Sequence, residues 1–181
     1  FMPDRVYVPG STSANNNIES VDLPVNVGVI KCGNELVLYD SGWKQQDYLK
    51  MTNSVNWAPL PDQLKLLGIQ PGDVTKIVIG HGHWDHGGAM LRALQIVRDR
   101  NGGREVPYYA HPDMFRARAA KLPDGSMRPM QDVPSVAALT AYGARVINTV
   151  EPNFPLDGLA FVSGEIPRMT PFETGLPGQH R

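Results

Sequence analysis

Apolar residues fall into short runs separated by polar or glycine-rich breaks, a pattern that predicts short strands alternating with short helices. Val and Ile dominate most of these runs, which favours strands. The predicted strands are Pro24–Lys31, Glu35–Tyr39, Val74–Ile79, Val106–Ala110, Arg145–Val150 and Leu159–Ser163. Cys32-Gly33-Asn34 separates the first two strands, so they are expected to form a hairpin.

A spacing of three to four residues between apolar side chains predicts helices between these strands. In Ala89–Arg98, for example, Leu91, Leu94 and Val97 fall on one face. The other predicted helices are Pro61–Leu67, Asp113–Lys121 and Ser135–Tyr142, and the predicted loops are Gly10–Ser20, His81–Gly88 and Leu122–Val133. A hairpin followed by alternating helices and strands is typical of a layered α/β fold.

The length of 181 residues, of which 41% are hydrophobic, predicts a single domain over residues 1–181. Seventeen basic and 18 acidic residues give a net charge of -1, which argues against a nucleic-acid partner or a polybasic membrane surface. No apolar run is long enough to span a bilayer. We therefore expect a small-molecule substrate, no nucleic acid and no membrane, and the oligomeric state stays open.

The cysteine content and the two ends add two expectations. Cys32 is the single cysteine, which favours a reducing compartment and predicts a cytoplasmic protein, with an exported protein that has no disulfide as the alternative. The chain begins with Phe1 and closes on the loop-like stretch Leu176–Arg181. We expect it to be a piece of a longer polypeptide.

The chemistry concentrates in His81-Gly82-His83-Trp84-Asp85-His86-Gly87-Gly88, which holds three of the five histidines. Imidazole nitrogens and carboxylate oxygens are good ligands for zinc and similar ions. Side chains two apart at the end of a strand point to the same side, so His81 and His83 can converge on one metal. Asp85 and His86 follow and can reach a second metal nearby. A merely solvated, histidine-rich loop is the alternative.

This motif, His-x-His-x-Asp-His after a strand, resembles the signature of the metallo-β-lactamase superfamily. Leu38-Tyr39-Asp40-Ser41-Gly42 is similar to the family's Leu-x-Asp-Thr-Gly, with Ser in place of Thr. The resemblance covers roughly residues 25–173. It implies an αββα sandwich, incomplete at the C-terminal end of this chain, and an Asp40 that orients the metal-binding loop.

Two further segments, Tyr109–Phe115 and Ser163–Arg168, resemble a subgroup similar to the enzymes named dihydropterin–ribofuranosylaminobenzene phosphate synthases. The superfamily supplies further metal ligands downstream, yet no histidine lies between His111 and His180. We expect the missing ligands in a further stretch of the polypeptide, after Arg181. A weak site for one metal, or substitution by His111 or His180, are the alternatives.

The resemblance implies a metal-dependent hydrolase with one or two zinc ions, or iron or manganese in their place. On this resemblance we expect a metal-activated water to attack an ester, lactone, amide or phosphoester of a small molecule, and Asp85 to take up or guide the proton of that water as well. A non-haem iron oxidoreductase and a non-catalytic metal-binding domain are the alternatives.

The remaining candidates are pocket residues. His111, Trp84, Glu165 and Arg168 are candidates to line the pocket. For Trp84 the alternative is packing against the sheet, and for Glu165 and Arg168 it is an ordinary ion pair. Arg116, Arg118, Lys121 and Arg128 form a basic stretch that meets either an anionic substrate or only water.

Overall fold

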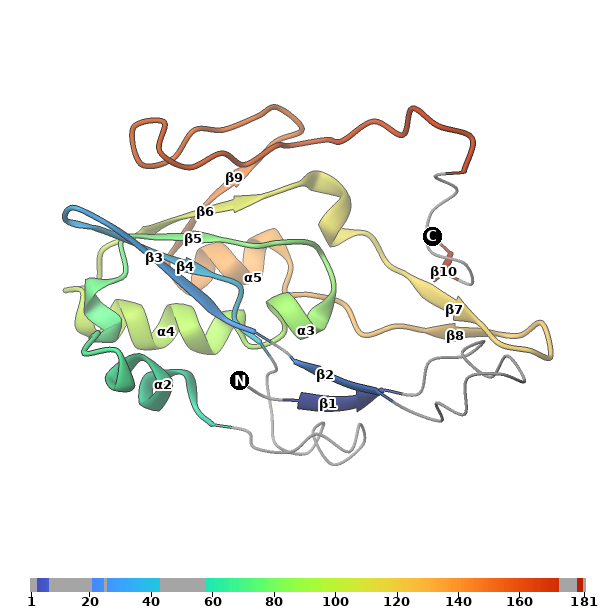
Figure 1. Cartoon of the computed structure of the whole chain (residues 1–181), viewed down its shortest axis with the longest axis horizontal. Helices are drawn as coiled ribbons and strands as arrows, with labels where there is room; N and C mark the ends of the chain where they lie inside the picture. The colour runs from blue at the N-terminus through green and yellow to red at the C-terminus, as the bar shows by residue number, and fades with distance from the viewer. Residues whose placement is uncertain (1–2, 7–20, 25, 43–57, 173–178, 181) are drawn as a thin grey trace.

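A five-stranded mixed sheet organises the protein (Figure 1). The computed structural model describes residues 3–6, 21–24, 26–42, 58–172 and 179–180. The strand order is β3-β4-β5-β6-β9, with β3 at Gly28–Cys32, β4 at Glu35–Tyr39, β5 at Lys76–Val78, β6 at Val106–Ala110 and β9 at Ala144–Asn148. β3 and β4 form the predicted antiparallel hairpin, and the remaining neighbours are parallel.

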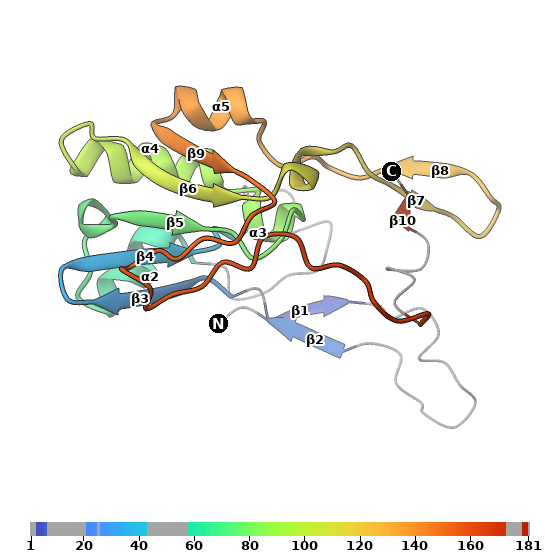
Figure 2. The same cartoon turned by 90° about the horizontal axis from the view of Figure 1, so that it is seen from above.

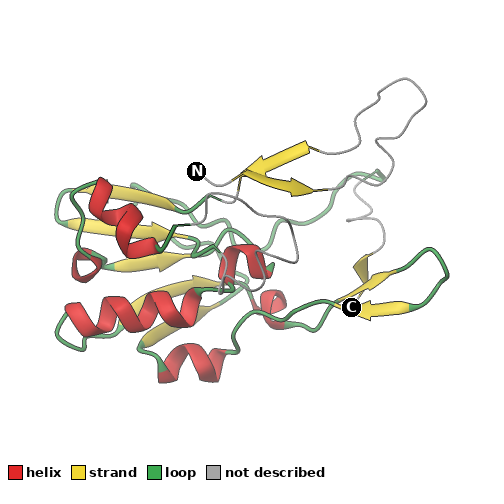
Figure 3. Cartoon of the chain, turned by 90° about the horizontal axis from the view of Figure 1, so that it is seen from below, coloured by secondary structure: helices red, strands yellow, loops and turns green. Residues whose placement is uncertain are grey.

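The helices lie on one face of this sheet (Figures 1 and 3). They are α2 at Leu60–Leu66, α3 at Trp84–Gly87, α4 at Met90–Arg100 and α5 at Val136–Ala141, with short 3-10 turns η1 at Pro71–Asp73 and η2 at Pro112–Phe115. Segment 149–172 runs on the opposite side of the sheet, as Figure 2 shows.

The core forms because side chains alternate along each strand. Leu38, Ile77 and Tyr108 are neighbours in the strand register, and none of them is exposed to solvent. Leu94 of α4 and Leu139 of α5 are equally buried in the same cluster. This packing fixes the sheet edge at which the polar motif begins.

Two smaller sheets lie beside the main one. β1 at Pro3–Val6 pairs antiparallel with β2 at Val21–Pro24. β7 at Ala119–Lys121 pairs with β8 at Met127–Pro129 and with β10 at Gln179–His180, and this arm extends away from the five-stranded sheet (Figure 1). None of the described helices has the length and apolar character that crossing a membrane requires.

The predicted helix Asp113–Lys121 is wrong. The structure has only the turn η2, after which Arg116 is extended, and β7 follows. In a helix the backbone N–H of Arg118 would donate to the carbonyl of Met114, four residues earlier. Here the guanidinium of Arg118 donates to that carbonyl instead, over 3.2 Å. A side chain has taken the place of the helical amide.

Other boundaries also differ from the predictions. The predicted loop His81–Gly88 contains the short helix α3, and the predicted strand Val74–Ile79 is reduced to β5 at Lys76–Val78. The predicted loop Leu122–Val133 contains β8, because the chain turns at a positive-φ Gly125 and pairs back on β7. Leu159–Ser163 is not a strand, since only one isolated bridge joins Val162 to Asn153. The first strand of the hairpin is Gly28–Cys32 rather than Pro24–Lys31. The predicted loop Gly10–Ser20 lies outside the described residues.

Candidate metal centre

The polar motif follows β5 at the carboxyl edge of the parallel strands. Asp40 follows β4 and His111 follows β6, so both lie at the same edge as the His81–Gly88 loop. In open α/β sheets ligands bind at this edge, since the loops that leave neighbouring strands meet there. The strand order thus brings together residues that are far apart in the sequence.

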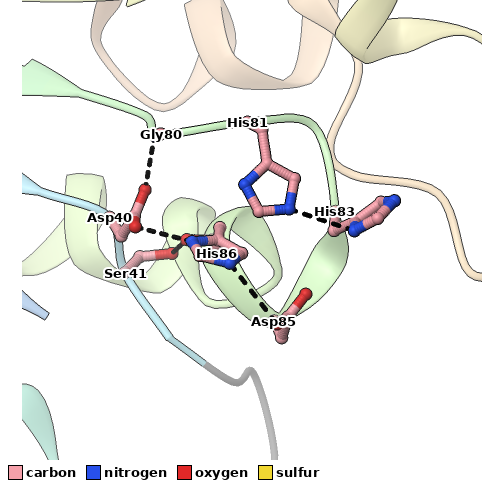
Figure 4. A network of polar contacts seen from close by, with 7 residues as sticks. All are labelled: Asp40, Ser41, Gly80, His81, His83, Asp85 and His86. Carbon is pink, nitrogen blue, oxygen red and sulfur yellow. Dashed lines mark hydrogen bonds and ion pairs between the residues drawn. The ribbon is translucent and has the colours of Figure 1, made fainter. Parts of the chain in front are cut away.

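Asp40 holds both ends of the loop (Figure 4). Its carboxylate accepts a hydrogen bond from the backbone N–H of Gly80 at 2.7 Å and another from Nδ1 of His86 at 2.6 Å. Only 1% of Asp40 is exposed, and its φ of 64° is one that Asp and Asn tolerate better than most residues. Because Nδ1 of His86 donates, the neutral ring keeps a lone pair on Nε2.

Ser41 and Gly42 add backbone anchors to the same loop. The N–H and the hydroxyl of Ser41 both donate to the carbonyl of His86, at 2.8 and 3.0 Å. The N–H of Ala89 donates to the carbonyl of Gly42 at 3.1 Å. The segment that follows β4 is therefore anchored to the C-terminal end of α3.

The three imidazoles of the motif form one cluster (Figure 4). The ring of His81 lies 4.0 Å from that of His86 and 4.6 Å from that of His83, centroid to centroid. Nε2 of His81 and Nδ1 of His83 are 3.0 Å apart. Oδ2 of Asp85 is 3.4 Å from Nε2 of His86.

These atoms lie close together two by two, but they do not converge on one point. Among the described residues, no group of three or more His, Cys, Asp or Glu side chains is arranged to hold a metal ion. The chemistry of these side chains nevertheless suits a metal ion, because three imidazoles and one carboxylate lie close together, His81 beside His83 and His86 beside Asp85. To bind one ion together, these side chains would have to adopt other rotamers.

The electrostatics differ between the two histidines nearest Asp40. The hydrogen bond to Asp40 raises the pKa of His86, and burial acts against it. For His81, burial lowers the pKa, and the neighbouring His86 and His83 lower it further. A lowered pKa keeps the imidazole of His81 neutral, which is the form that binds metals.

His111 and Trp84 have different surroundings. Nδ1 of His111 accepts from the N–H of Asp113 at 3.1 Å, so Nε2 carries the proton, and this buried Nε2 has no partner in the described part of the chain. Trp84 is 8% exposed and packs in the hydrophobic core, which agrees with the packing alternative.

Glu165 and Arg168 are both exposed, in the segment that follows β9. The backbone N–H of Glu165 donates to the carbonyl of Val150, and this bond ties the segment to the end of β9. The part of the chain that the structure describes has no ion pair between the two side chains, and whether they line a pocket stays a prediction.

Sequence reasoning missed two contributors. One is Ser41, which donates two hydrogen bonds to the carbonyl of His86; in its motif, the sequence predicted a role only for Asp40. Arg118 was placed in a basic stretch, yet its guanidinium lies against the loop and donates to the carbonyl of Gly82 at 2.8 Å. A carbonyl partner leaves no signature in the sequence, so only the fold reveals this contact.

A family model decides the classification. Residues 20–180 match the model of the metallo-beta-lactamase superfamily. The chain belongs to this superfamily. That membership confirms the predicted metallo-β-lactamase-like α/β fold.

The curated relatives are longer proteins. N-acyl homoserine lactonase AiiB of Agrobacterium fabrum is 32% identical over 51% of this chain and 39% of its own length. The 7,8-dihydropterin-6-methyl-4-(beta-D-ribofuranosyl)-aminobenzene-5'-phosphate synthase of Methanocaldococcus jannaschii is 26% identical over 60% of this chain and 35% of its own. This chain therefore spans less than half the length of these two relatives.

Two solved structures resemble this chain over most of its length, at low sequence identity. An N-acyl homoserine lactone hydrolase with the product N-hexanoyl-L-homoserine bound at its metal centre is 17% identical, over 82% of this chain and 59% of that one, with a TM-score of 0.47. A quorum-quenching N-acyl homoserine lactone lactonase is also 17% identical, over 82% of this chain and 56% of that one, with a TM-score of 0.46.

Proposed function

We propose that the protein is a metal-dependent hydrolase that acts on an ester, lactone, amide or phosphoester of a small molecule. His81, His83, Asp85 and His86 are the proposed ligands, and one or two zinc ions are the proposed metal. The observation that carries the proposal is the short contact between Asp40 and His86 beside two further imidazoles. Membership of the superfamily and the lactonase relative support it.

The roles of the residues follow from their partners. Asp40 accepts the proton of Nδ1 of His86, so it orients the ring and leaves Nε2 for the metal. Asp85, with a side chain that is 38% exposed, is open enough to take up the proton of an attacking water as well as to serve as a ligand. When bound, a divalent cation supplies a lowered pKa for that water and polarises the substrate's oxygen.

Metal content measured by mass spectrometry on the full-length protein tests the ligands. We expect zinc in the unaltered protein and a loss of metal in His83→Ala and in Asp85→Ala. Asp99→Ala removes an exposed carboxylate on α4 and is the matched control, which should keep its metal. Unchanged metal in His83→Ala would refute the ligand assignment.

Hydrolysis of a small panel tests the reaction. An N-acyl homoserine lactone, a p-nitrophenyl ester and p-nitrophenyl phosphate cover the proposed bond types. We expect turnover of at least one of them, lost on chelation and restored by zinc. Stoichiometric iron together with oxygen consumption would overturn the hydrolase in favour of an oxidoreductase.

A further inference from the structure

The middle of the metal-binding loop lies against the turn η2. Gly82 is buried, and a Cβ added there would lie 2.5 Å from Cα of Met114 and 2.6 Å from its Cβ. Such distances are shorter than van der Waals contact, so the backbone of the loop touches η2 directly. The loop and η2 are therefore packed as one unit, although they are about thirty positions apart in the chain.

Arg118 joins these two segments through one guanidinium group. It donates to the carbonyl of Gly82 at 2.8 Å, to that of Asp113 at 2.9 Å and to that of Met114 at 3.2 Å. The planar group with its several N–H donors can reach all three acceptors at once, which the single ammonium of a lysine cannot. The loop carbonyl is thus tied to the two carbonyls of η2.

The Gly82 carbonyl belongs to the peptide that leads into His83. Its direction fixes the backbone between His81 and His83, and so the directions in which the two imidazoles leave the chain. The nitrogens of those rings are 3.0 Å apart in the structure. His83 is extended, with φ of -90° and ψ of 151°, and α3 begins directly after it.

Arg116 offers a contrast two residues away. Its side chain is 56% exposed and pairs with the carboxylate of Asp113 at 2.7 Å, so it makes an ordinary surface ion pair. Arg118 is half-buried and its donors are engaged by backbone carbonyls. The basic stretch thus contains one solvated arginine and one that acts on the loop.

We propose that Arg118 is a positioning residue that holds the Gly82 carbonyl and thereby sets the placement of His81 and His83 for metal binding. This inference rests on the proposed metal centre. It predicts that the loop loses its alignment, and the metal its affinity, when the guanidinium is removed while the global fold persists.

The test compares Arg118→Met, Arg118→Lys and the control Arg116→Met in the full-length protein loaded with cobalt(II). We expect Arg118→Met to weaken cobalt affinity by about 10–100-fold, as loss of a supporting partner usually does, and to alter the visible spectrum of the bound cobalt. Arg118→Lys should fall between Arg118→Met and the unaltered protein, and Arg116→Met should match the unaltered protein. Equal affinities in Arg118→Met and the unaltered protein, or equal losses in both Met variants, would overturn the inference.

Amide hydrogen exchange on the metal-free protein separates this inference from the metal centre itself. The N–H groups of His86 and Gly87 both donate to the carbonyl of His83, so they report on the loop. We expect both to exchange faster in Arg118→Met, with the amides of β5 unchanged. No cobalt uptake by the unaltered protein would refute the metal centre, and unchanged exchange at these two amides would refute the positioning role.

Discussion

Replacing Asp40 by Asn tests the contact on which the site depends. The substitution keeps the shape and the tolerance of a positive φ, and removes the charge. The new oxygen can still accept from the N–H of Gly80, but the new amide group is a donor that faces Nδ1 of His86. Two donors cannot pair, so the imidazole must move its proton to Nε2, which occupies the nitrogen that the metal needs.

The expected cost follows from the two hydrogen bonds. Bonds to a charged group contribute about 1.5–3 kcal/mol each and neutral ones about 0.5–1.5 kcal/mol. Asp40 is 1% exposed, so water cannot compensate. With two bonds weakened by about 1 kcal/mol or more each, we expect the free energy of unfolding to fall by about 2–3 kcal/mol.

Urea unfolding of the metal-free protein measures the free energy, and nitrogen-15 NMR of the histidine rings measures the tautomer. Asp157→Asn is the matched control, because Asp157 has a similar φ of 53° and is exposed. It should change stability by less than about 0.5 kcal/mol. An Asp40→Asn variant as stable as this control, or a proton that stays on Nδ1 of His86, would refute the role given to Asp40.

Three further outcomes follow from the contacts. Gly82→Ala should destabilise the protein by about 1–3 kcal/mol, because the new Cβ would clash with the backbone of η2. In Gly80→Ala the new Cβ would instead meet the hydroxyl end of the flexible Tyr39 side chain, so the loss should be smaller. Thermal unfolding of the two variants compares these losses. Hydrogen bonds from Lys76 and then Thr75 lower the pKa of Glu35 below its ordinary 4.5, so Glu35→Gln should lose about 0.5 kcal/mol in urea unfolding at neutral pH, and the difference should vanish as pH falls through the lowered pKa. Tyr108→Phe removes a buried hydroxyl that has no partner within the described structure, so stability measured by urea unfolding should stay equal or rise by up to about 1 kcal/mol, and a clear loss would contradict this.

The strands that build the central sheet were predictable because their burial follows directly from apolar patterning. Glu35–Tyr39 and Val106–Ala110 were predicted with their observed bounds. The turn of the first hairpin was predictable too, because Gly33 lies between the two strands. In the structure Gly33 takes a φ of 56°, a conformation that favours glycine. The superfamily and its motif were likewise readable from the sequence.

What the sequence could not supply were contacts between a side chain and a distant backbone. Nothing local distinguishes Arg118 from Arg116. The helix predicted over both is absent, because the chain is already extended at Arg116 and the guanidinium of Arg118 bonds to the carbonyl that a helical amide would have used. The pairing of donors in the histidine cluster was equally hidden, because it depends on side-chain rotations rather than on spacing.

The reach of Asp40 has a consequence for the order in which the protein folds. All four proposed ligands lie within six positions of one another. The single carboxylate of Asp40 that holds their loop in place lies 46 positions before His86 and 40 positions before Gly80. Closing such loops costs entropy that pairing of β4 with β5 must first repay. We therefore expect an ion to bind to a sheet edge that has already formed, instead of templating it. At a free concentration of 100 times its dissociation constant, the ion would stabilise the folded state by about 2.7 kcal/mol. Removing the ion with a chelator should therefore also lower the unfolding temperature.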